Sequence, residues 1–423
     1  MTKMSDDEHL QGYTWPTNIS NNNYEMMDKD RKAVEFLRNG ANDLLTEYYD
    51  TNFNLLRWAQ GYGYDLDEGL KNLRKHLKFR RYYDLDEHHL IREHEILKKY
   101  FPIGLVGETG HGNTLLVIES AGKIDLMGIL RAVQLSDFLI QRARFQEEML
   151  EQMNGIERRT GKQASVIYIL DLEGLKFDPS LLQVVTGPYR ILWASVYTNY
   201  PEWIDHFIMV NVPSFISILW KAIVPFLPER TRNKVKICSA GSDWKQQVLQ
   251  FAKPEYVPVH WGGTKLDSNG DPMCREILNI PFEPIPSTLY WTPSEESPAI
   301  KDLDQVTIPA SKSKILTFLV KGNEEKMFFI LNRFCDRTFG QGIWYSEDES
   351  AIEWPLEEME EWCPDFDYPG MPTVDWLRIR IPGAGVYKLK FGNEQAWIRS
   401  LTIHYRMRFV NEIGELLDFQ QIP

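Results

Sequence analysis

The sequence predicts a multidomain α/β plus all-β protein that begins with a small helical region. Three observations support this prediction. Residues 30–100 show helical periodicity, residues 113–252 alternate short apolar runs with longer helical patterns, and prolines separate strand-like runs beyond residue 264. A chain of 423 residues is long enough for two or three domains that each bury a core.

The N-terminal hundred residues divide into two parts. Residues 1–29 are expected to be disordered, and they contain no apolar core of a signal peptide, which predicts a cytoplasmic protein. Residues 30–100 are expected to be helical, and "DLDEGLKNLRKHLKFRRYYDLD" (65–86) carries leucines on one helical face. The opposite face is expected to be solvated and is basic: Lys71, Arg74, Lys75, Lys78 and Arg81.

The middle of the chain has the order of an α/β domain. Apolar runs predict strands at 114–119, 165–171, 206–211 and 235–238, and helical patterns lie at 125–153, 178–198, 214–227 and 243–252. Strands that alternate with helices in this order predict a largely parallel sheet with right-handed crossovers.

One of these crossovers, "PSFISILWKAIVPFLP" (213–228), is unusually apolar. Its polar side chains Ser214, Ser217 and Lys221 fall in one narrow stripe of a helix. The segment is too short to span a bilayer, which takes about 20 apolar residues. A helix of this kind is either buried in protein or in contact with another apolar surface, and the pattern alone leaves both alternatives open.

The last part of the chain predicts an antiparallel β-sandwich. Turn signals and prolines separate five strand-like runs: "KILTFLVK", "KMFFILN", "VDWLRIRI", "GVYKLKF" and "IRSLTIHYRMRF". The expected organisation is a disordered segment (1–29), a helical region (30–100), an α/β domain (101–270) and a β-sandwich (271–423).

The net charge of -13 is concentrated in one segment. Between Arg337 and Arg378 there are eleven acidic residues and no lysine or arginine. Residues 347–367 are therefore expected to form a solvated loop or to meet a basic partner. No basic stripe with interleaved aromatic residues occurs, so nucleic acid is not an expected partner.

Motifs that would indicate catalysis are incomplete. "GETGHGNT" (107–114) has the spacing of a phosphate-binding loop, but Asn113 stands where the lysine is needed, and a strand rather than a helix follows. We expect a turn there. Asp171 and Glu173 lie where a strand ends, and we expect them to cap a loop.

No metal site or cofactor is expected either. His88, His89 and His94 match no metal-ligand spacing and are expected on a polar helix face. The four cysteines are widely spaced, which predicts free buried thiols. The sequence favours a binding protein over an enzyme.

Several stretches resemble the CRAL-TRIO lipid-transfer family. They are "FNLLRWAQGYGYDLDEGLKNLRKHLKFRR" (53–81), "VIYILDLEGL" (166–175), the block from "YPEWID" to "KVKI" (200–237) and "VPVHWGGT" (257–264). The C-terminal strands, with "IPGAGVYKLKFGNEQAWIRS" (381–400), resemble a GOLD β-sandwich. The combination is similar to supernatant protein factor and its relatives.

The resemblance implies that the helix after "VNVP" is the gate of a lipid pocket and swings outward at a membrane. Its candidate gate and pocket residues are Phe215, Ile218, Leu219, Trp220, Ile223, Val224 and Phe226. In the stretch that follows, Arg230, Arg232 and Lys236 are candidates to face an anionic membrane.

The resemblance also implies a headgroup site. Phosphatidylinositol-binding members use an acid in the "YPE" motif and a lysine after the gate, which match Glu202 and Lys234. Two departures weaken phospholipid recognition. Gln60 stands at the position of a family arginine, and Val166 and Tyr168 stand where phosphatidylcholine-binding members have small hydroxyl residues. A phosphoinositide and an isoprenoid-type ligand, such as a tocopherol, retinoid or squalene-like molecule, both remain open.

The expected function is that of a cytoplasmic lipid-binding or lipid-transfer protein that visits membranes transiently. It would hold one hydrophobic ligand beneath the gate, with no other cofactor. The alternative is an adaptor in membrane trafficking or signalling. Its GOLD domain would bind a protein partner through the acidic loop 347–367, and its lipid domain would act as a sensor or anchor.

Overall fold

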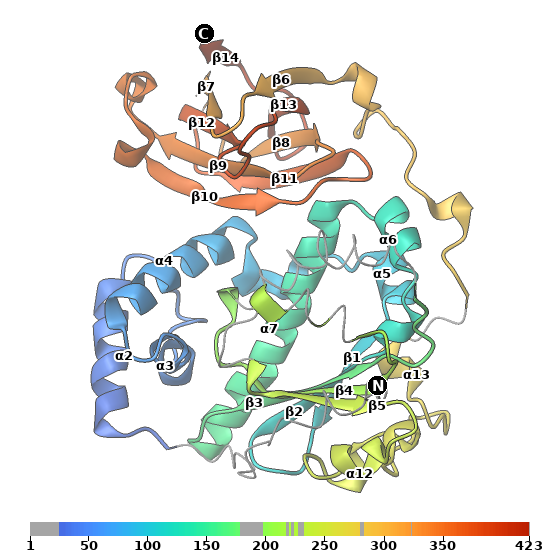
Figure 1. The fold of residues 1–423 in the computed structure, drawn as a ribbon. Helices are drawn as coiled ribbons and strands as arrows, with labels where there is room; N and C mark the ends of the chain where they lie inside the picture. The colour runs from blue at the N-terminus through green and yellow to red at the C-terminus, as the bar shows by residue number, and fades with distance from the viewer. Residues whose placement is uncertain are drawn as a thin grey trace, which may run out of the picture.

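The computed structural model describes residues 25–177, 198–216, 220, 224–226, 232–279, 283–322 and 324–422. The first described helices pack together beside the sheet (Figure 1): α2 (Asp28–Gly40), α3 (Asn52–Gly61) and α4 (Leu66–Tyr82). The side chain of Asp65 accepts a hydrogen bond from the Glu68 amide and so caps α4. Leu73 and Leu77 are buried on the predicted face of that helix.

The α/β domain contains a five-stranded sheet with the order β1-β2-β3-β4-β5. Its strands are β1 (Ile103–Glu108), β2 (Thr114–Glu119), β3 (Ser165–Asp171), β4 (Ile204–Val212) and β5 (Val235–Ser239). The last four are mutually parallel, which confirms the predicted fold class, and β1 adds an antiparallel edge. The "GETGHGNT" stretch makes the β1–β2 hairpin turn, where Gly110 and Gly112 have positive φ.

The helices around the sheet differ from the prediction in two places. The expected helix 125–153 is two helices, α6 (Leu126–Ala132) and α7 (Leu135–Thr160), because Val133 is extended. The expected helix 243–252 is limited to α12 (Trp244–Val248). Most of the expected helices 178–198 and 214–227 lies outside the described residues. Two short helices, α5 (Glu95–Tyr100) and α13 (Arg275–Leu278), flank β1.

The two faces of the sheet have separate cores, because side chains alternate along each strand. We call the face that α7 covers the α7 face; its buried side chains include Leu115, Val117, Val166, Tyr168, Phe207 and Met209. The opposite face, which we call the α12 face, packs against Trp244 and Val248. Its buried strand residues are Leu116, Ile118, Ile167, Ile169, Ile208 and Val210.

The C-terminal part is an antiparallel sandwich of two sheets, with the orders β10-β9-β12-β7-β14 and β11-β8-β13-β6. Its strands are β6 (Asp304–Ile308), β7 (Ser313–Val320), β8 (Met327–Phe334), β9 (Phe339–Ser346), β10 (Glu360–Tyr368), β11 (Asp375–Ile381), β12 (Gly385–Gly392), β13 (Leu401–Asn411) and β14 (Phe419–Ile422). The expectation that 347–367 is entirely a loop is wrong, since β10 contains residues 360–367. Pro364 and bulges against β9 interrupt the usual strand pattern there.

Short 3-10 helices connect these elements. They are η1 (Leu85–Leu90), η2 (Ala121–Lys123), η3 (Val224–Phe226), η4 (Pro254–Tyr256), η5 (Val259–Trp261), η6 (Ser287–Leu289), η7 (Ile300–Asp302), η8 (Glu349–Ile352) and η9 (Leu356–Glu358).

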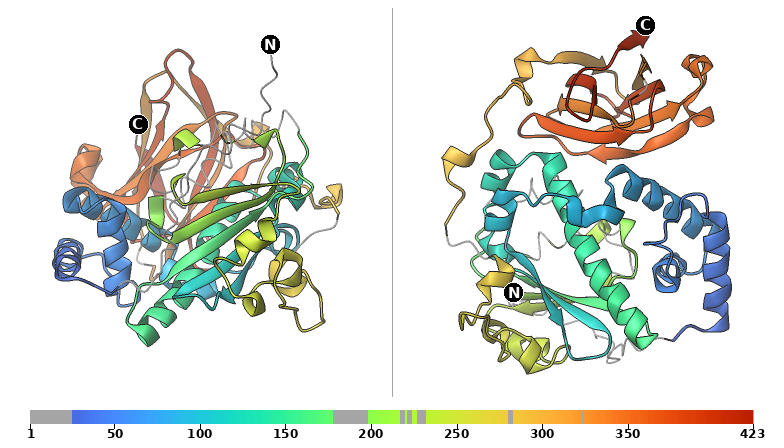
Figure 2. Two further views of the ribbon diagram at one scale, coloured as in Figure 1. Left: turned by 60° about the horizontal axis from the view of Figure 1, so that its bottom comes forward. Right: turned by 180° about the vertical axis from the view of Figure 1, so that it is seen from behind.

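The sandwich rests on the helices of the α/β part, as the right-hand view of Figure 2 shows. Tyr82 of α4 and Leu139 of α7 belong to the hydrophobic core of the sandwich. Two pairs join α4 to the acidic strand β10: Lys78 with Glu361 (3.3 Å) and Arg81 with Glu360 (2.7 Å). The basic face of α4 is therefore only partly solvated, and a basic partner of the acidic segment lies in the same chain.

Candidate functional site

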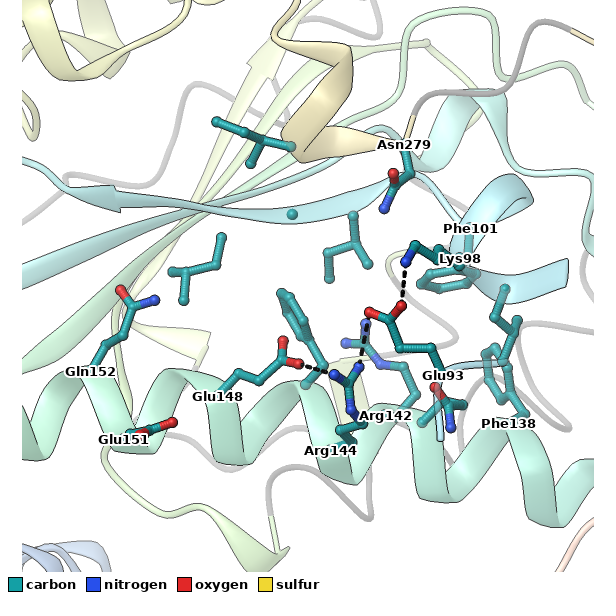
Figure 3. Close-up of a pocket in the computed structure, with 17 residues that line it drawn as sticks. Glu93, Lys98, Phe101, Phe138, Arg142, Arg144, Glu148, Glu151, Gln152 and Asn279 are labelled. Carbon is teal, nitrogen blue, oxygen red and sulfur yellow. Dashed lines mark hydrogen bonds and ion pairs between the residues drawn. The ribbon is translucent and has the colours of Figure 1, made fainter. Parts of the chain in front are cut away.

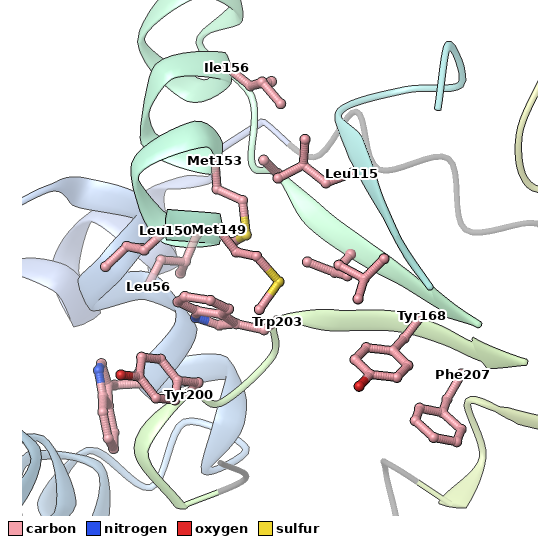
Figure 4. Close-up of a cluster of buried hydrophobic side chains, with 14 of the residues drawn as sticks. Leu56, Leu115, Met149, Leu150, Met153, Ile156, Tyr168, Tyr200, Trp203 and Phe207 are labelled. Carbon is pink, nitrogen blue, oxygen red and sulfur yellow. The ribbon is translucent and has the colours of Figure 1, made fainter. Parts of the chain in front are cut away.

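The α7 face combines sheet side chains with two methionines of α7. Met149 and Met153 of α7 are buried against the strands (Figure 4), and Met209 of β4 belongs to the same core. Unbranched, polarizable methionine side chains adapt to differently shaped apolar neighbours. The face is therefore suited to contact an apolar molecule whose shape is not fixed.

Two aromatic rings lie side by side on this face. The rings of Tyr168 and Phe207 are stacked with centroids 5.1 Å apart, and both side chains project from their strands in Figure 4. The Tyr168 hydroxyl donates a hydrogen bond to the buried carboxylate of Glu119 at the end of β2. The phenol adds a polar group to the face, but that group already has a partner within the fold.

The chain that follows β4 packs onto the α7 face. Ile216 is buried, and Phe215 and Trp220 are half-buried against the same core. The ring of Phe215 also meets the exposed ring of Phe177 edge-on, with centroids 5.4 Å apart. Phe215 and Trp220, which sequence reasoning placed in the gate, both pack against this core.

The other predicted gate residues are less well placed. Ile218, Leu219 and Ile223 lie outside the described residues, while Val224 and Phe226 begin and end η3.

Glu202 and Lys234 are brought together as an ion pair. Lys234 Nζ donates to Glu202 Oε2 (2.9 Å) and to the carbonyl of Ile204 (2.8 Å), and the two charged side chains are 27% and 19% exposed. The pairing follows from the topology, since each residue lies just before one of the adjacent parallel strands β4 and β5. Phe215 follows the other end of β4, whose nine residues span about 26 Å from first to last Cα at 3.3 Å per residue.

The three predicted membrane-facing residues do not form one patch in the described part of the chain. Arg230 lies outside the described residues, and Arg232 is exposed. Lys236 is opposite Ile208 in the β4–β5 register and therefore lies on the α12 face. Its ammonium donates to Gln247, and burial lowers its pKa.

A cavity of about 410 Å³ opens between β1, α5, α7 and α13 (Figure 3). Its apolar walls come from Leu97, Phe101, Ile103, Leu105, Phe138, Phe145 and Ile277. Ile103, Leu105 and Phe145 also pack against the core of the α7 face, so the cavity adjoins that face at its β1 edge.

Charged side chains surround the mouth of this cavity. Arg144 pairs with Glu148 (2.9 Å) and Glu93 (3.3 Å), and Glu93 also pairs with Lys98. Burial raises the pKa of Glu148. Sequence reasoning missed this site because its residues come from four separate elements. The only local sign was the alternation of aromatic and basic residues in "FLIQRARF" (138–145).

The motifs that were rejected as catalytic have structural roles. Asp171 is buried and accepts hydrogen bonds from the Trp261 indole (2.9 Å), the Asn211 amide (2.8 Å) and the backbone of Glu173 (2.9 Å). All four cysteines are free and buried. In the part of the chain that the structure describes, no group of three or more acidic, histidine or cysteine side chains is arranged to hold a metal ion.

An apolar sheet face, an adjoining cavity and an apolar segment packed against the same core characterise this α/β domain. The family model described as "CRAL/TRIO domain" matches residues 98–263. A second model, "F28H7_8_C:-like, C-terminal domain", matches residues 289–418.

Two curated relatives match this chain along most of its length. CRAL-TRIO domain-containing protein F28H7.8 of Caenorhabditis elegans is 33% identical over 393 residues, which cover 91% of this chain and 92% of that protein. Protein ctg-1 of the same organism is 24% identical over 357 residues, or 84% of this chain and 90% of that one. The crystal structure of Sfh5 covers 62% of this chain and 94% of its own at 15% identity, with a TM-score of 0.47.

The chain belongs to the CRAL-TRIO domain-containing proteins. Membership in this family implies binding or transfer of a lipophilic ligand. Among the described helices, none is both long enough and apolar enough to cross a membrane.

Proposed function

We propose that this protein holds one lipophilic molecule against the α7 face, beneath the segment 213–226, and exchanges or presents it at membranes. The cavity of about 410 Å³ beside that face is the observation that supports this function most strongly. Small-molecule sites have volumes of about 300–1,000 Å³, with apolar walls and a few polar groups. The cavity has such a volume and includes aromatic and aliphatic walls, while charged and amide side chains make up about half of its lining.

The segment after β4 supplies the part that moves. Phe215 and Trp220 are only half-buried, so their removal from the face costs less than the roughly 1.5–3 kcal/mol of a fully buried apolar side chain. Insertion of the same apolar residues into a membrane interface offsets that cost. Opening is thus favoured at a membrane and disfavoured in water.

The Glu202–Lys234 ion pair distinguishes the two candidate classes of ligand. Glu202 and Lys234 already satisfy each other, so a phosphoinositide headgroup must replace part of their ion pair. An isoprenoid-type ligand would leave the pair intact. The two classes therefore differ in whether Lys234 contributes to affinity.

The adaptor alternative depended on the acidic segment 347–367. Glu360 and Glu361 in that segment pair with Arg81 and Lys78 of α4, so this part of it is engaged within the chain. The acidic residues at 347–358 stay exposed, and we propose the lipid-binding function first because the family match supports it.

A transfer assay with matched variants tests the proposal. The probes are fluorescent phosphatidylinositol and tocopherol, moved from donor to acceptor vesicles. Phe215→Asp places a charge on the α7 face and should reduce transfer of the bound class at least tenfold. Phe36→Asp makes the same change at an exposed position of α2 and should have no effect. Normal transfer by a folded Phe215→Asp protein would contradict the proposal.

A further inference from the structure

The two most exposed large apolar side chains of the described residues are neighbours in the loop between β12 and β13. Trp397 is 92% exposed and Ile398 is 90% exposed. Isolated apolar residues are common on protein surfaces, but a tryptophan is seldom so completely in water. The pair, which we call the Trp397 tip, therefore requires an explanation.

The loop that carries the Trp397 tip is held in place by hydrogen bonds. The side-chain amide of Asn393 donates to the carbonyls of Ile308 (3.1 Å) and Arg399 (3.0 Å). The hydroxyl of Ser311 donates to the carbonyl of Ala396 (2.9 Å). The fold thus holds the tip in an outward position and limits its ability to fold back onto the sandwich.

Charge separates the two ends of the sandwich. The strand directions place the connections 309–312, 335–338, 369–374 and 393–400 at the Trp397 end. These connections carry three basic and two acidic residues, Lys312, Arg337, Arg399, Asp336 and Glu394. One further acid, Asp367 at the end of β10, accepts a hydrogen bond from Gln395 of the tip loop.

The opposite end is strongly acidic. Its connections are 321–326, 347–359, 382–384 and 412–418. They carry two basic residues, Lys321 and Lys326, and eleven acidic ones: Glu324, Glu325, Glu347, Asp348, Glu349, Glu353, Glu357, Glu358, Glu412, Glu415 and Asp418. An anionic surface would repel this end, and the sandwich would turn its Trp397 end toward that surface.

We propose that the Trp397 tip inserts into the interfacial layer of an anionic bilayer and docks the sandwich there. Tryptophan is enriched at membrane–water interfaces, where its ring is apolar and its N–H stays hydrated. Arg399, next to the tip, is exposed and can attract anionic headgroups. Exposed Arg337 donates to the Ser400 carbonyl (3.3 Å) and lies 3.8 Å from Asp336, so it contributes less. This inference rests on the proposed function in one respect: both require the protein to visit a membrane.

A bilayer fits this tip better than a protein partner does. Stable protein interfaces bury about 800 Å² on each partner, whereas a single tryptophan buries about 150–250 Å². Two adjacent side chains at a loop tip supply a small part of a protein interface, but a bilayer accepts them without a complementary surface.

Site-specific labelling tests the insertion directly. Because the four native cysteines are all buried, Ile398→Cys can be labelled selectively with a polarity-sensitive dye. Ile413→Cys is the matched control, since Ile413 is also exposed, at 78%, but lies at the acidic end. With vesicles of phosphatidylcholine and phosphatidylserine at about 4:1, we expect a blue shift of the dye at residue 398 and none at residue 413.

Binding of the unlabelled protein tests the energetic contribution. Trp397→Ser with Ile398→Ser should weaken partitioning into these vesicles at least tenfold, which corresponds to about 1.4 kcal/mol. The control pair Ile413→Ser with Leu416→Ser should leave partitioning unchanged.

Three results would overturn the proposal. They are an unshifted dye at residue 398 on vesicle-bound protein, wild-type partitioning by the Trp397 and Ile398 double variant, and no vesicle binding by the wild type. The lipid bound to the purified protein is measured separately. If residue 398 inserts but the purified protein carries no lipid, only the proposed function is overturned. If the protein carries lipid but the tip stays in water, only this inference is overturned.

Discussion

Asp375 of β11 accepts two hydrogen bonds from Ser136 in the first turn of α7, one from the backbone N–H (2.8 Å) and one from the hydroxyl (2.7 Å). Both side chains are buried, and the Arg333 guanidinium donates to the same carboxylate (2.9 and 3.1 Å). Amide groups in the first turn of a helix lack partners within the helix, so a residue 239 positions away in the sequence caps α7. Hydrogen bonds from Ser136 to Asp375 therefore join the sandwich to α7, the helix that covers the sheet and lines the cavity.

This buried contact predicts a large effect of Asp375→Asn. The substitution leaves the Arg333 guanidinium buried without its carboxylate, which costs about 3–5 kcal/mol. We expect guanidinium denaturation to show a loss of that size in the free energy of unfolding. Asp302→Asn, at an exposed position, should change it by less than about 0.5 kcal/mol. A loss below about 1 kcal/mol for Asp375→Asn would contradict the role given to this residue.

The neighbouring Asp137 predicts a pH dependence. Burial, with a smaller contribution from the Asp375 carboxylate, raises the pKa of Asp137 from 3.8 to about 6. Because the pKa is higher in the folded state, ionisation disfavours folding as the pH rises from about 4 to about 6, and the penalty persists above that range. Asp137→Asn should therefore raise Tm at pH 7.5 and leave it unchanged at about pH 4. Equal Tm differences at both pH values would show that the effect is not one of ionisation.

The pair between Arg81 and Glu360 predicts a modest, salt-sensitive coupling between α4 and β10. The charged atoms are 2.7 Å apart, and the Arg81 guanidinium also lies 3.9 Å over the Trp362 ring. Both charged side chains are partly exposed, so a double-mutant cycle of Arg81→Ala and Glu360→Ala should give about 0.2–1 kcal/mol. The coupling should shrink in 1 M salt, where the Debye length is about 3 Å. Strictly additive effects at low salt would mean that the pair makes no contribution.

Lys234 predicts which class of lipid is bound. If a phosphorylated headgroup replaces part of the Glu202–Lys234 pair, Lys234→Ala should weaken phosphatidylinositol binding at least tenfold and leave tocopherol binding unchanged. Lys236→Ala is the control, because Lys236 lies on the α12 face. Both affinities would be measured by fluorescence titration. Equal losses of affinity for the two ligands would show that the ion pair stabilises the fold and does not contact the ligand.

Much of the fold could be predicted from local sequence patterns. Apolar runs located β2, β3 and β4 because each of these strands is buried on both faces. β1 was missed because Gly104 and Gly107 interrupt its pattern. The structure explains Gly104, since a Cβ atom there would lie 2.3 Å from the carbonyl oxygen of Ile277 in α13.

Less of the candidate site could be predicted, because its residues meet only in three dimensions. Glu202 and Lys234 were identified as candidates through a family resemblance, but their ion pair depends on the adjacency of β4 and β5. The contacts of α4 with β10 join residues 279 and 283 positions apart, a separation that no helical or strand period reveals. The acidic composition of β10 instead suggested a loop.

The most direct test of the central claim is mass spectrometry of what the protein carries. The protein would be purified from its own cellular background and extracted with organic solvent. We predict one lipophilic molecule per chain for the wild type and for Phe36→Asp, and a large loss for Phe215→Asp. A wild-type protein that yields no lipid, and that takes up neither phosphatidylinositol nor tocopherol when these are added, would contradict the account.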